Sequence, residues 1–201
     1  MTRLYRCGPG GGLSPADFSD LKALIKSGKI FCFPTDTVYG LGCSAFSSTG
    51  RRRIFEIKGR PYGKPLPFFV HSVVEARRWA LWTQTAQKLA KRHWPGALTL
   101  VLRPSEEGRA LLSPGADSLA LRIPDHALLI KLLRGAGEPW ATTSANISGQ
   151  KPVGGEKELI DVFQDLADAI VLAGPCGGIA STVVDAREDR PKVLRQGTIE
   201  I

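Results

Sequence analysis

Apolar residues recur along this chain at two kinds of spacing. Intervals of three and four residues, typical of a buried helix face, predict helices between Ser14 and Gly28, after Asp125, and at 50–58, 73–80, 83–93 and 156–166. Short apolar runs, typical of buried strands, lie at 30–33, 66–70, 97–102, 118–123, 139–143, 169–172, 181–185 and 192–195. Helices interleaved with short strands favour an α/β fold, a single layered domain in which a twisted mixed sheet is flanked by helices.

Helix-capping residues sharpen two of these predictions. Ser14, Pro15 and Asp17 form the pattern expected at a helix start, and Gly28 is expected to end that helix. Asp125 is expected to cap the helix that follows it. The buried face of this second helix would carry Leu128, Leu129, Leu132 and Leu133.

The length of 201 residues fits one domain spanning 1–201. Its core is expected at 14–197, after a flexible lead-in of residues 1–13 that contains the glycine-rich stretch GPGGG. The sequence has no internal repeat and no long linker. A chain of this size buries around 70% of its unfolded surface, so the fold needs no disulfide or metal to hold it together.

The net charge of +8 comes from one stretch of the chain. Between Arg51 and Arg92 there are eleven Lys and Arg residues against two acids, Glu56 and Glu75. This excess suits a solvated basic face, a phosphate-rich ligand or a nucleic acid. Charge alone leaves all three alternatives open.

Cysteine and histidine spacings indicate neither a disulfide framework nor a structural metal site. The four cysteines include no C-x-x-C pair, and the three histidines have no paired spacing. No run of 18 apolar residues is present, and the N-terminus lacks the apolar core of a signal peptide. We therefore expect a cytoplasmic protein without membrane association.

Three polar clusters follow apolar runs, where a strand would deliver them to the edge of the sheet. They are PTDTVYGLG (34–42), which is followed by Lys58 and Arg60, then TTSANISG (142–149) and STVVD (181–185). Hydroxyls and unpaired N–H groups of a turn suit a carboxylate or a small polar substrate, whereas Lys and Arg suit phosphate oxygens.

Several of these residues also have a purely structural interpretation. Lys58 and Arg60 would favour the C-terminal end of a helix, and Thr35 is an ordinary turn former. Arg122 closes an apolar strand and needs an anionic partner, for which Asp117 and Asp125 are candidates. Ligand binding is the alternative in each case.

Seven segments, taken in order, resemble the YrdC/Sua5/TsaC family, the L-threonylcarbamoyladenylate synthases of tRNA modification. They are PTDTVYGLG (34–42), KGRP (58–61) with KPL (64–66), WPGALTLVL (94–102), LRIPD (121–125), TSANISG (143–149), STVVD (181–185) and LRQG (194–197). None is diagnostic alone, but their common order makes the resemblance strong. It implies the YrdC/RibB-like fold.

The resemblance also implies a reaction. L-threonine, bicarbonate or CO2, and ATP would give threonylcarbamoyl-AMP and pyrophosphate, with Mg²⁺ held mainly by the ATP phosphates and no metal site of the protein's own. The sequence has no G-x-S-x-G motif for a covalent intermediate, which fits attack of a threonine carbamate on the α-phosphate. The product would pass to the transferase machinery that completes the t6A modification of tRNA.

Motif positions assign the implied site residues. Those implied to bind L-threonine are Thr35, Arg122, Thr142 and Thr182. Those implied to bind the nucleotide are Lys58, Arg60, Ser118, Ser144, Asn146 and Arg195, and Lys58 and Arg60 would also act in catalysis. In an extended segment the alternating residues Thr142, Ser144 and Asn146 would share one face. Many relatives have a histidine where this chain has Phe69, and His71, two residues further on, is left out of the site.

A second interpretation is a module that binds double-stranded RNA or tRNA on a basic concave surface. It explains the basic stretch but gives Thr35, Thr142 and Thr182 no role, and the sequence lacks recognisable aromatic stacking platforms. Weak RNA binding is compatible with the enzyme as well. A third interpretation is another carbamoyl transfer in the same pocket, as in hydrogenase maturation, but acylphosphatase and zinc-finger segments are absent from the sequence.

Overall fold

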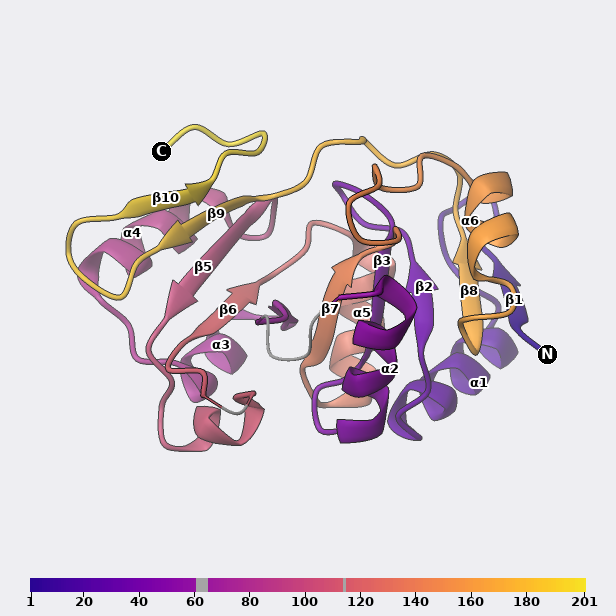
Figure 1. The fold of residues 1–201 in the computed structure, drawn as a ribbon, viewed down its shortest axis with the longest axis horizontal. Coiled ribbons are helices and arrows are strands. Elements are labelled where there is room, and N and C mark those ends of the chain that lie inside the picture. The colour runs from indigo at the N-terminus through magenta and orange to yellow at the C-terminus, as the bar shows by residue number, and fades with distance from the viewer. Residues whose placement is uncertain (61–64, 114) are drawn as a thin grey trace.

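The computed structural model describes residues 1–60, 65–113 and 115–201, whose strands join in one mixed sheet (Figure 1). The strands are β1 (Arg3–Arg6), β2 (Phe31–Phe33), β3 (Gly40–Ser44), β4 (Phe68–Phe69), β5 (Leu98–Leu102), β6 (Leu119–Arg122), β7 (Trp140–Ser144), β8 (Ala169–Leu172), β9 (Thr182–Asp185) and β10 (Lys192–Arg195). Their order in the sheet is β1-β8-β2-β3-β7-β4-β6-β5-β9-β10. The predicted mixed sheet flanked by helices is confirmed.

The described α-helices lie close to their predicted positions, whereas the 3₁₀ helix was not predicted from the sequence. They are α1 (Pro15–Lys26), α2 (Ser48–Lys58), α3 (Val73–Trp79), α4 (Gln84–His93), the 3₁₀ helix η1 (Glu107–Leu111), α5 (Ala127–Ala136) and α6 (Glu156–Phe163). Ser14 caps α1 by accepting a hydrogen bond from the Asp17 amide, and Gly28 follows that helix with a φ of 77°. α5 begins after His126 without any side-chain cap, so the prediction that Asp125 caps it is wrong.

Two segments were assigned wrongly from the sequence. Residues 3–6 were expected in a flexible lead-in, but they form β1, which pairs in parallel with β8 at the edge of the sheet. No strand was predicted within the polar cluster at 34–42 that follows the strand at 30–33, but residues 40–44 form β3, which pairs with β2 and β7. The ring of Phe33 packs directly on β3, and a Cβ at Gly40 or Gly42 would lie within 2.9 Å of it. These glycines, which weaken a strand signal, are therefore required by close packing.

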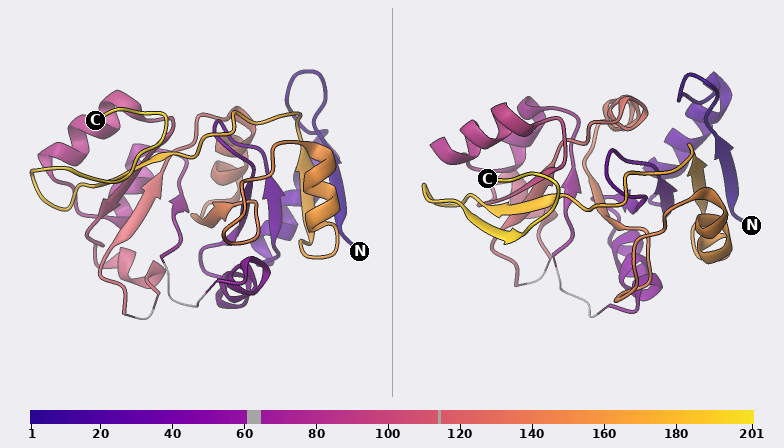
Figure 2. Two further views of the ribbon diagram at one scale, coloured as in Figure 1. Left: turned by 45° about the horizontal axis from the view of Figure 1, so that its top comes forward. Right: turned by 90° about the horizontal axis from the view of Figure 1, so that it is seen from above.

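The helices cover the two ends of the sheet differently. α1 and α5 pack on one face of the half that contains β2, β3 and β7, and α2 and α6 pack on its other face. At the other end, α3 and α4 lie behind β5 and β6, whereas the opposite face carries no helix in the parts of the chain that the structure describes (Figure 2). This open face is where the sheet can receive a ligand.

Alternation along β5 matches this arrangement. Leu98, Leu100 and Leu102 are fully buried against the helices. Thr99 and Val101, between them, face the open side and line a cavity there. A strand that reads apolar throughout therefore presents its two faces to different surroundings.

Candidate functional site

A cavity of about 630 Å³ lies on the open face of β6, β5 and β9. The strands contribute its floor, and the loop before β3, the end of β7 and residues near β10 form its walls. Its cationic side chains are Arg60, Arg122, Arg187, Lys192 and Arg195, and its carboxylates are Asp117 and Asp185. Arg187 pairs with both carboxylates, at 3.1 Å and 2.8 Å. The cavity therefore carries an excess of positive charge, which suits an anionic ligand.

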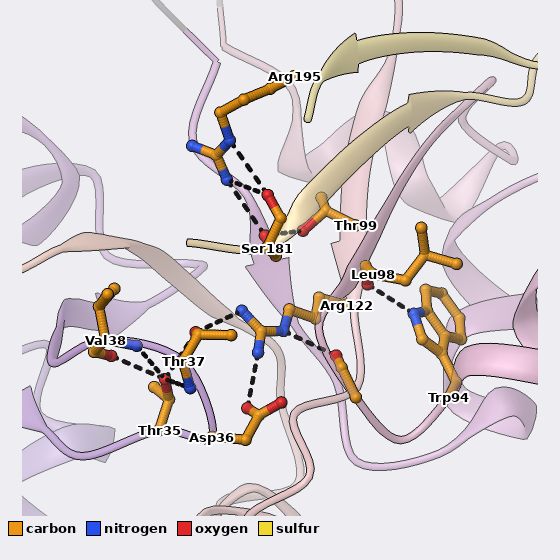
Figure 3. A network of polar contacts seen from close by, with 11 residues as sticks. Thr35, Asp36, Thr37, Val38, Trp94, Leu98, Thr99, Arg122, Ser181 and Arg195 are labelled. Carbon is orange, nitrogen blue, oxygen red and sulfur yellow. Dashed lines mark hydrogen bonds and ion pairs between the residues drawn. The ribbon is translucent and has the colours of Figure 1, made fainter. Parts of the chain in front are cut away.

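Arg122 is the buried cation of this cavity, with 4% of its surface exposed. Its Nε donates to the Gly96 carbonyl at 3.0 Å, Nη1 donates to Thr37 Oγ1 at 3.0 Å, and Nη2 donates to Asp36 Oδ1 at 2.6 Å (Figure 3). A guanidinium has five N–H donors, so two have no partner among the described residues. Burial lowers the pKa of Arg122, and the adjacent Asp36 carboxylate opposes that shift.

The partner of Arg122 differs from both sequence candidates. Asp117 pairs with Arg187, and Arg122 pairs with Asp36, which belongs to the PTDTVYGLG segment. The Phe69 ring lies 5.4 Å from the Arg122 guanidinium carbon, close enough for a cation–π contact. His71 Nδ1 lies 2.6 Å from Glu75 Oε2, and His71 is not among the described residues that line the cavity.

Thr35 lines the cavity, but its hydroxyl organises the loop that it belongs to. Thr35 Oγ1 accepts hydrogen bonds from the amides of Thr37 and Val38 and donates to the Val38 carbonyl at 2.7 Å. A further bond of 2.9 Å joins Thr35 to the hydroxyl of Thr37, which in turn accepts from Arg122. The turn-forming interpretation of Thr35 thus describes its contacts, which also hold Arg122 in place.

Thr142 and Ser144 bring the end of β7 into the cavity wall. Thr142 Oγ1 donates to the Pro67 carbonyl at 3.0 Å, and Ser144 Oγ donates to Asn146 Oδ1 at 2.6 Å. Asn146 was expected on the same face, but it is not among the described lining residues. Its amide nitrogen donates instead to the carbonyls of Ile147 and Gln150.

Lys58 has the surroundings of a structural brace. It ends α2, where Ser47 caps the first turn and Gly59, with a φ of 58°, caps the last. Lys58 Nζ donates to the Ser144 carbonyl at 2.8 Å and to the carbonyl and side-chain oxygens of Asn146 at 2.9 Å and 2.7 Å. These bonds match the three donors of an ammonium group. Burial, with a smaller effect of Arg60, lowers the pKa of Lys58 to about 8.

Arg60 reaches the cavity, whereas Lys58 is not among its described lining residues. The one side-chain hydrogen bond of Arg60 in the described chain, to the Pro65 carbonyl, is long at 3.5 Å, and burial lowers the pKa of Arg60. Pro61 and Lys64, which complete the KGRP and KPL segments, lie outside the described residues.

β9 and β10 form the far wall of the cavity, which includes Ser181 and Arg195. Arg195 donates from Nε and Nη2 to the Ser181 carbonyl, at 3.1 Å and 2.8 Å, and burial lowers its pKa. Ser118 also lines the cavity, and its contact with a nucleotide stays a prediction.

Thr182 is fully buried and not among the described residues that line the cavity. Its hydroxyl donates to the Ile199 carbonyl and accepts from the amides of Gly197 and Ile199, so it fastens the segment after β10. The expected contact of Thr182 with L-threonine therefore has no support from its position.

Sequence reasoning missed Thr37, Thr99 and Arg187. Thr99 carried a signal, because it is the one hydroxyl in an otherwise apolar strand. Arg187 gave none, since its importance depends on its pairing with Asp117, 70 residues away.

The described residues hold no group of three His, Cys, Asp or Glu side chains that could bind a metal ion. Among those same residues, no helix is long and apolar enough to cross a membrane.

Comparison with known proteins places this arrangement in a family. Residues 23–197 match the Sua5/YciO/YrdC family model, which is described as "Telomere recombination". The chain is 38% identical to the threonylcarbamoyl-AMP synthase of Pyrococcus abyssi over 179 residues, which cover 88% of this chain and 53% of the relative. It is 39% identical to the Bacillus subtilis enzyme of that name over 184 residues, which cover 88% of this chain and 52% of the relative.

The chain thus spans about half the length of these two relatives. A relative of similar length is the putative threonylcarbamoyl-AMP synthase of Mycobacterium tuberculosis, which is 34% identical over 202 residues, or 99% of this chain and 92% of the relative.

Solved structures agree with the fold. P. abyssi Sua5 complexed with L-threonine has a TM-score of 0.87 and 35% identity, and the match covers 98% of this chain and 57% of that one. Escherichia coli YciO has a TM-score of 0.91 and 25% identity, with 100% and 98% covered. The match to the family model, the identity to curated relatives and the shared fold agree, and this chain belongs to the Sua5/YciO/YrdC family.

Proposed function

We propose that this protein is an L-threonylcarbamoyladenylate synthase, a nucleotidyltransferase that supplies the t6A modification of tRNA. It would join L-threonine, bicarbonate or CO2, and ATP, releasing pyrophosphate. Its curated relatives carry the name threonylcarbamoyl-AMP synthase, and a relative of known structure was solved with L-threonine. The tRNA-modification transferase machinery would receive the product.

The observation that carries the proposal is the state of Arg122. It is buried at the cavity, its orientation is fixed by three hydrogen bonds, and two N–H donors have no partner among the described residues. A fixed guanidinium with two available donors suits a carboxylate, which accepts two parallel hydrogen bonds. Thr35 and Thr142 line the same cavity and complete the proposed threonine site.

The cations and hydroxyls further along the cavity suit the nucleotide. Arg60 and Arg195 would bind phosphate oxygens, and Ser118 and Ser144 offer hydroxyls beside them. Mg²⁺ would arrive bound to the ATP phosphates, where it neutralises their charge. Lys58 would serve by holding Ser144, and neither Asn146 nor Thr182 is retained as a direct contact.

The proposed chemistry needs no covalent enzyme intermediate. The threonine amine adds to CO2 and loses a proton, which gives a carbamate. A carbamate oxygen then forms a bond to the α-phosphorus of ATP, and the bond from that phosphorus to the β-phosphate bridging oxygen breaks with its electron pair on pyrophosphate. Arg122 would hold the threonine carboxylate, and Arg60 and Arg195 would stabilise the charge that develops on phosphate oxygens.

Pyrophosphate release tests the proposal. Protein with Mg-ATP and bicarbonate should release pyrophosphate when L-threonine is added, and mass spectrometry should detect threonylcarbamoyl-AMP. Valine, which lacks the hydroxyl, should support a rate lower by several orders of magnitude. Equal rates with valine or without an amino acid would contradict the proposal.

Weak RNA binding is a second proposal, supported by α4. Its exposed side includes Lys88, Lys91 and Arg92, and none of the three has an ion pair in the described chain. Binding of this kind should be independent of sequence and fall steeply with salt. Filter binding at low and high salt tests it, and tight binding in high salt without threonine-dependent turnover would favour the RNA-binding module.

A further inference from the structure

A pair of hydroxyls lies on the cavity side of β5 and β9. Thr99 Oγ1 and Ser181 Oγ are 2.9 Å apart, and both side chains are at least 95% buried. Arg195 Nη2 donates to the same Ser181 oxygen at 3.2 Å as well as to the Ser181 carbonyl (Figure 3). Thr99 thus contacts the residue that holds Arg195 without contacting Arg195 itself.

Hydrogen counting shows what the pair can offer to a ligand. Two hydroxyls carry two hydrogens, and the bond between them uses one. Arg195 has no acceptor atoms, so it cannot take the second, and no other partner of either hydroxyl is present in the described chain. One O–H donor therefore remains in the cavity that both residues line.

This donor lies between two cations. In Figure 3 the Thr99–Ser181 pair separates the guanidinium of Arg195 from that of Arg122. The positive charge of Arg195 contributes to lowering the pKa of Arg122, so the two groups are close enough to interact. A ligand whose anionic groups contact both cations would lie next to the hydroxyls of Thr99 and Ser181.

Packing alone does not explain the Thr99 hydroxyl. Neighbouring positions in this strand carry leucine and valine, and valine has the shape and strand preference of threonine. The only hydrogen bond of the Thr99 side chain in the described chain is the one to Ser181. A buried hydroxyl that serves a single polar neighbour points to a role in orienting that neighbour.

We propose that Thr99 is a positioning residue of this site. It orients the Ser181 hydroxyl, and through it the Arg195 guanidinium, so that one O–H donor lies between the two arginines where the carbamate meets the α-phosphate. The proposal rests on the proposed function for the reacting groups, whereas the orientation of Arg195 is a property of the protein itself and can be measured without turnover.

The test compares Thr99→Val with Thr99→Ser, which keeps the hydroxyl. Thr83→Val is the matched control, because the Thr83 hydroxyl caps α4 and donates to the Ala186 carbonyl away from the cavity. Thr99→Val should lower kcat for pyrophosphate release by about 10- to 100-fold, the loss of one charge-assisted network contact. Thr99→Ser should restore most of the rate, and Thr83→Val should affect stability alone.

Two further readouts separate positioning from general damage. In a double-mutant cycle, Arg195→Gln should lower kcat by a smaller factor in the Thr99→Val background than in the natural protein, because the Thr99 and Arg195 side chains act together. In ¹⁵N NMR, hydrogen exchange at the Arg195 Nε–H, which donates to Ser181, should accelerate at least about tenfold in Thr99→Val. It should stay unchanged in Thr99→Ser and Thr83→Val.

The NMR result holds whether or not the protein makes threonylcarbamoyl-AMP, so failure of the two proposals can be told apart. Unchanged Arg195 exchange in folded Thr99→Val would overturn the positioning role. Additive effects in the cycle, or a Thr99→Ser variant as slow as Thr99→Val, would overturn it too.

Discussion

Lys58 and Arg122 are both 4% exposed, but they lie in regions that use a buried cation differently. Around Lys58, at the end of α2, the three ammonium donors bind the carbonyl of Ser144 and two oxygens of Asn146. Around Arg122, at the end of β6, three contacts fix the guanidinium and two donors are left in the described chain. Burial alone does not separate a brace from a binding group, whereas a count of donors does.

The largest effect should come from removing the Arg122 guanidinium. Arg122→Gln alone would leave Asp36 as a partly buried carboxylate without its partner, so the informative variant is Arg122→Gln combined with Asp36→Asn. This double variant should stay folded and lose about 1000-fold in threonine-dependent pyrophosphate release. Arg78→Ala, at an exposed ion pair with Glu107, serves as the control. A double variant with near-normal turnover would remove Arg122 from the site.

Lys58→Met should act on stability first. It leaves the oxygens of Ser144 and Asn146 without their buried donor, and we expect the free energy of unfolding to fall by about 2–4 kcal/mol. Urea denaturation measures the change. If Lys58→Met kept the stability of the natural protein and lost only activity, Lys58 would act on the substrate. That result would contradict the distinction between Lys58 as a brace and Arg122 as a binding group.

A pH series sharpens the interpretation of Lys58. Burial lowers its pKa from 10.5 to about 8 in the folded protein. Between these two values the unfolded chain binds more protons at this residue than the folded one, so the contribution of Lys58 to stability rises with pH, by up to about 1.4 kcal/mol per pH unit. The difference in unfolding free energy between the natural protein and Lys58→Met should follow this rise from pH 8 to 10. A difference independent of pH would mean that the three acceptors hold the pKa near its ordinary value.

The smallest effect is expected at Ser144, which connects the two regions. Its carbonyl accepts from Lys58, and its side chain lines the cavity. Ser144→Ala keeps the backbone acceptor, so stability should change by less than about 1 kcal/mol. The KM for ATP should rise about three- to tenfold, as steady-state kinetics would measure. A large loss of stability would show that the hydroxyl bond to Asn146, rather than Lys58, holds this turn.

The two regions also differ in what the sequence predicted. The strand before Arg122 and its need for an anionic partner could be read from the pattern, because an arginine that ends an apolar run must be compensated. The identity of that partner, Asp36, could not, since the pairing depends on how the loop before β3 folds back across 86 residues. Lys58 was expected to bind phosphate because its motif contains Arg60 as well. Only the fold reveals that the turn after β7 lies against the end of α2 and takes all three of its donors.

The alternation of side chains predicted correctly which residues within a strand share a face. It failed for residues of the polar clusters that lie beyond the end of a strand. Thr142 and Ser144 share the cavity wall as expected. Asn146 does not, because the strand has ended at Ser144 and the chain turns. The expected placement of Thr182 in the cavity has no support for a related reason. Its neighbour Ser181 faces the cavity, and because side chains alternate along β9, Thr182 lies on the opposite side.

Calorimetric binding of L-threonine and L-threoninol, which lacks the carboxylate, tests the central claim most directly. If the two available donors of Arg122 bind the carboxylate, the natural protein should prefer L-threonine by at least about 100-fold, since two charge-assisted hydrogen bonds are at stake. Folded Lys58→Met should keep this preference, and the Arg122→Gln, Asp36→Asn double variant should lose it. A preference that survives in the double variant, or disappears with Lys58→Met, would contradict the account.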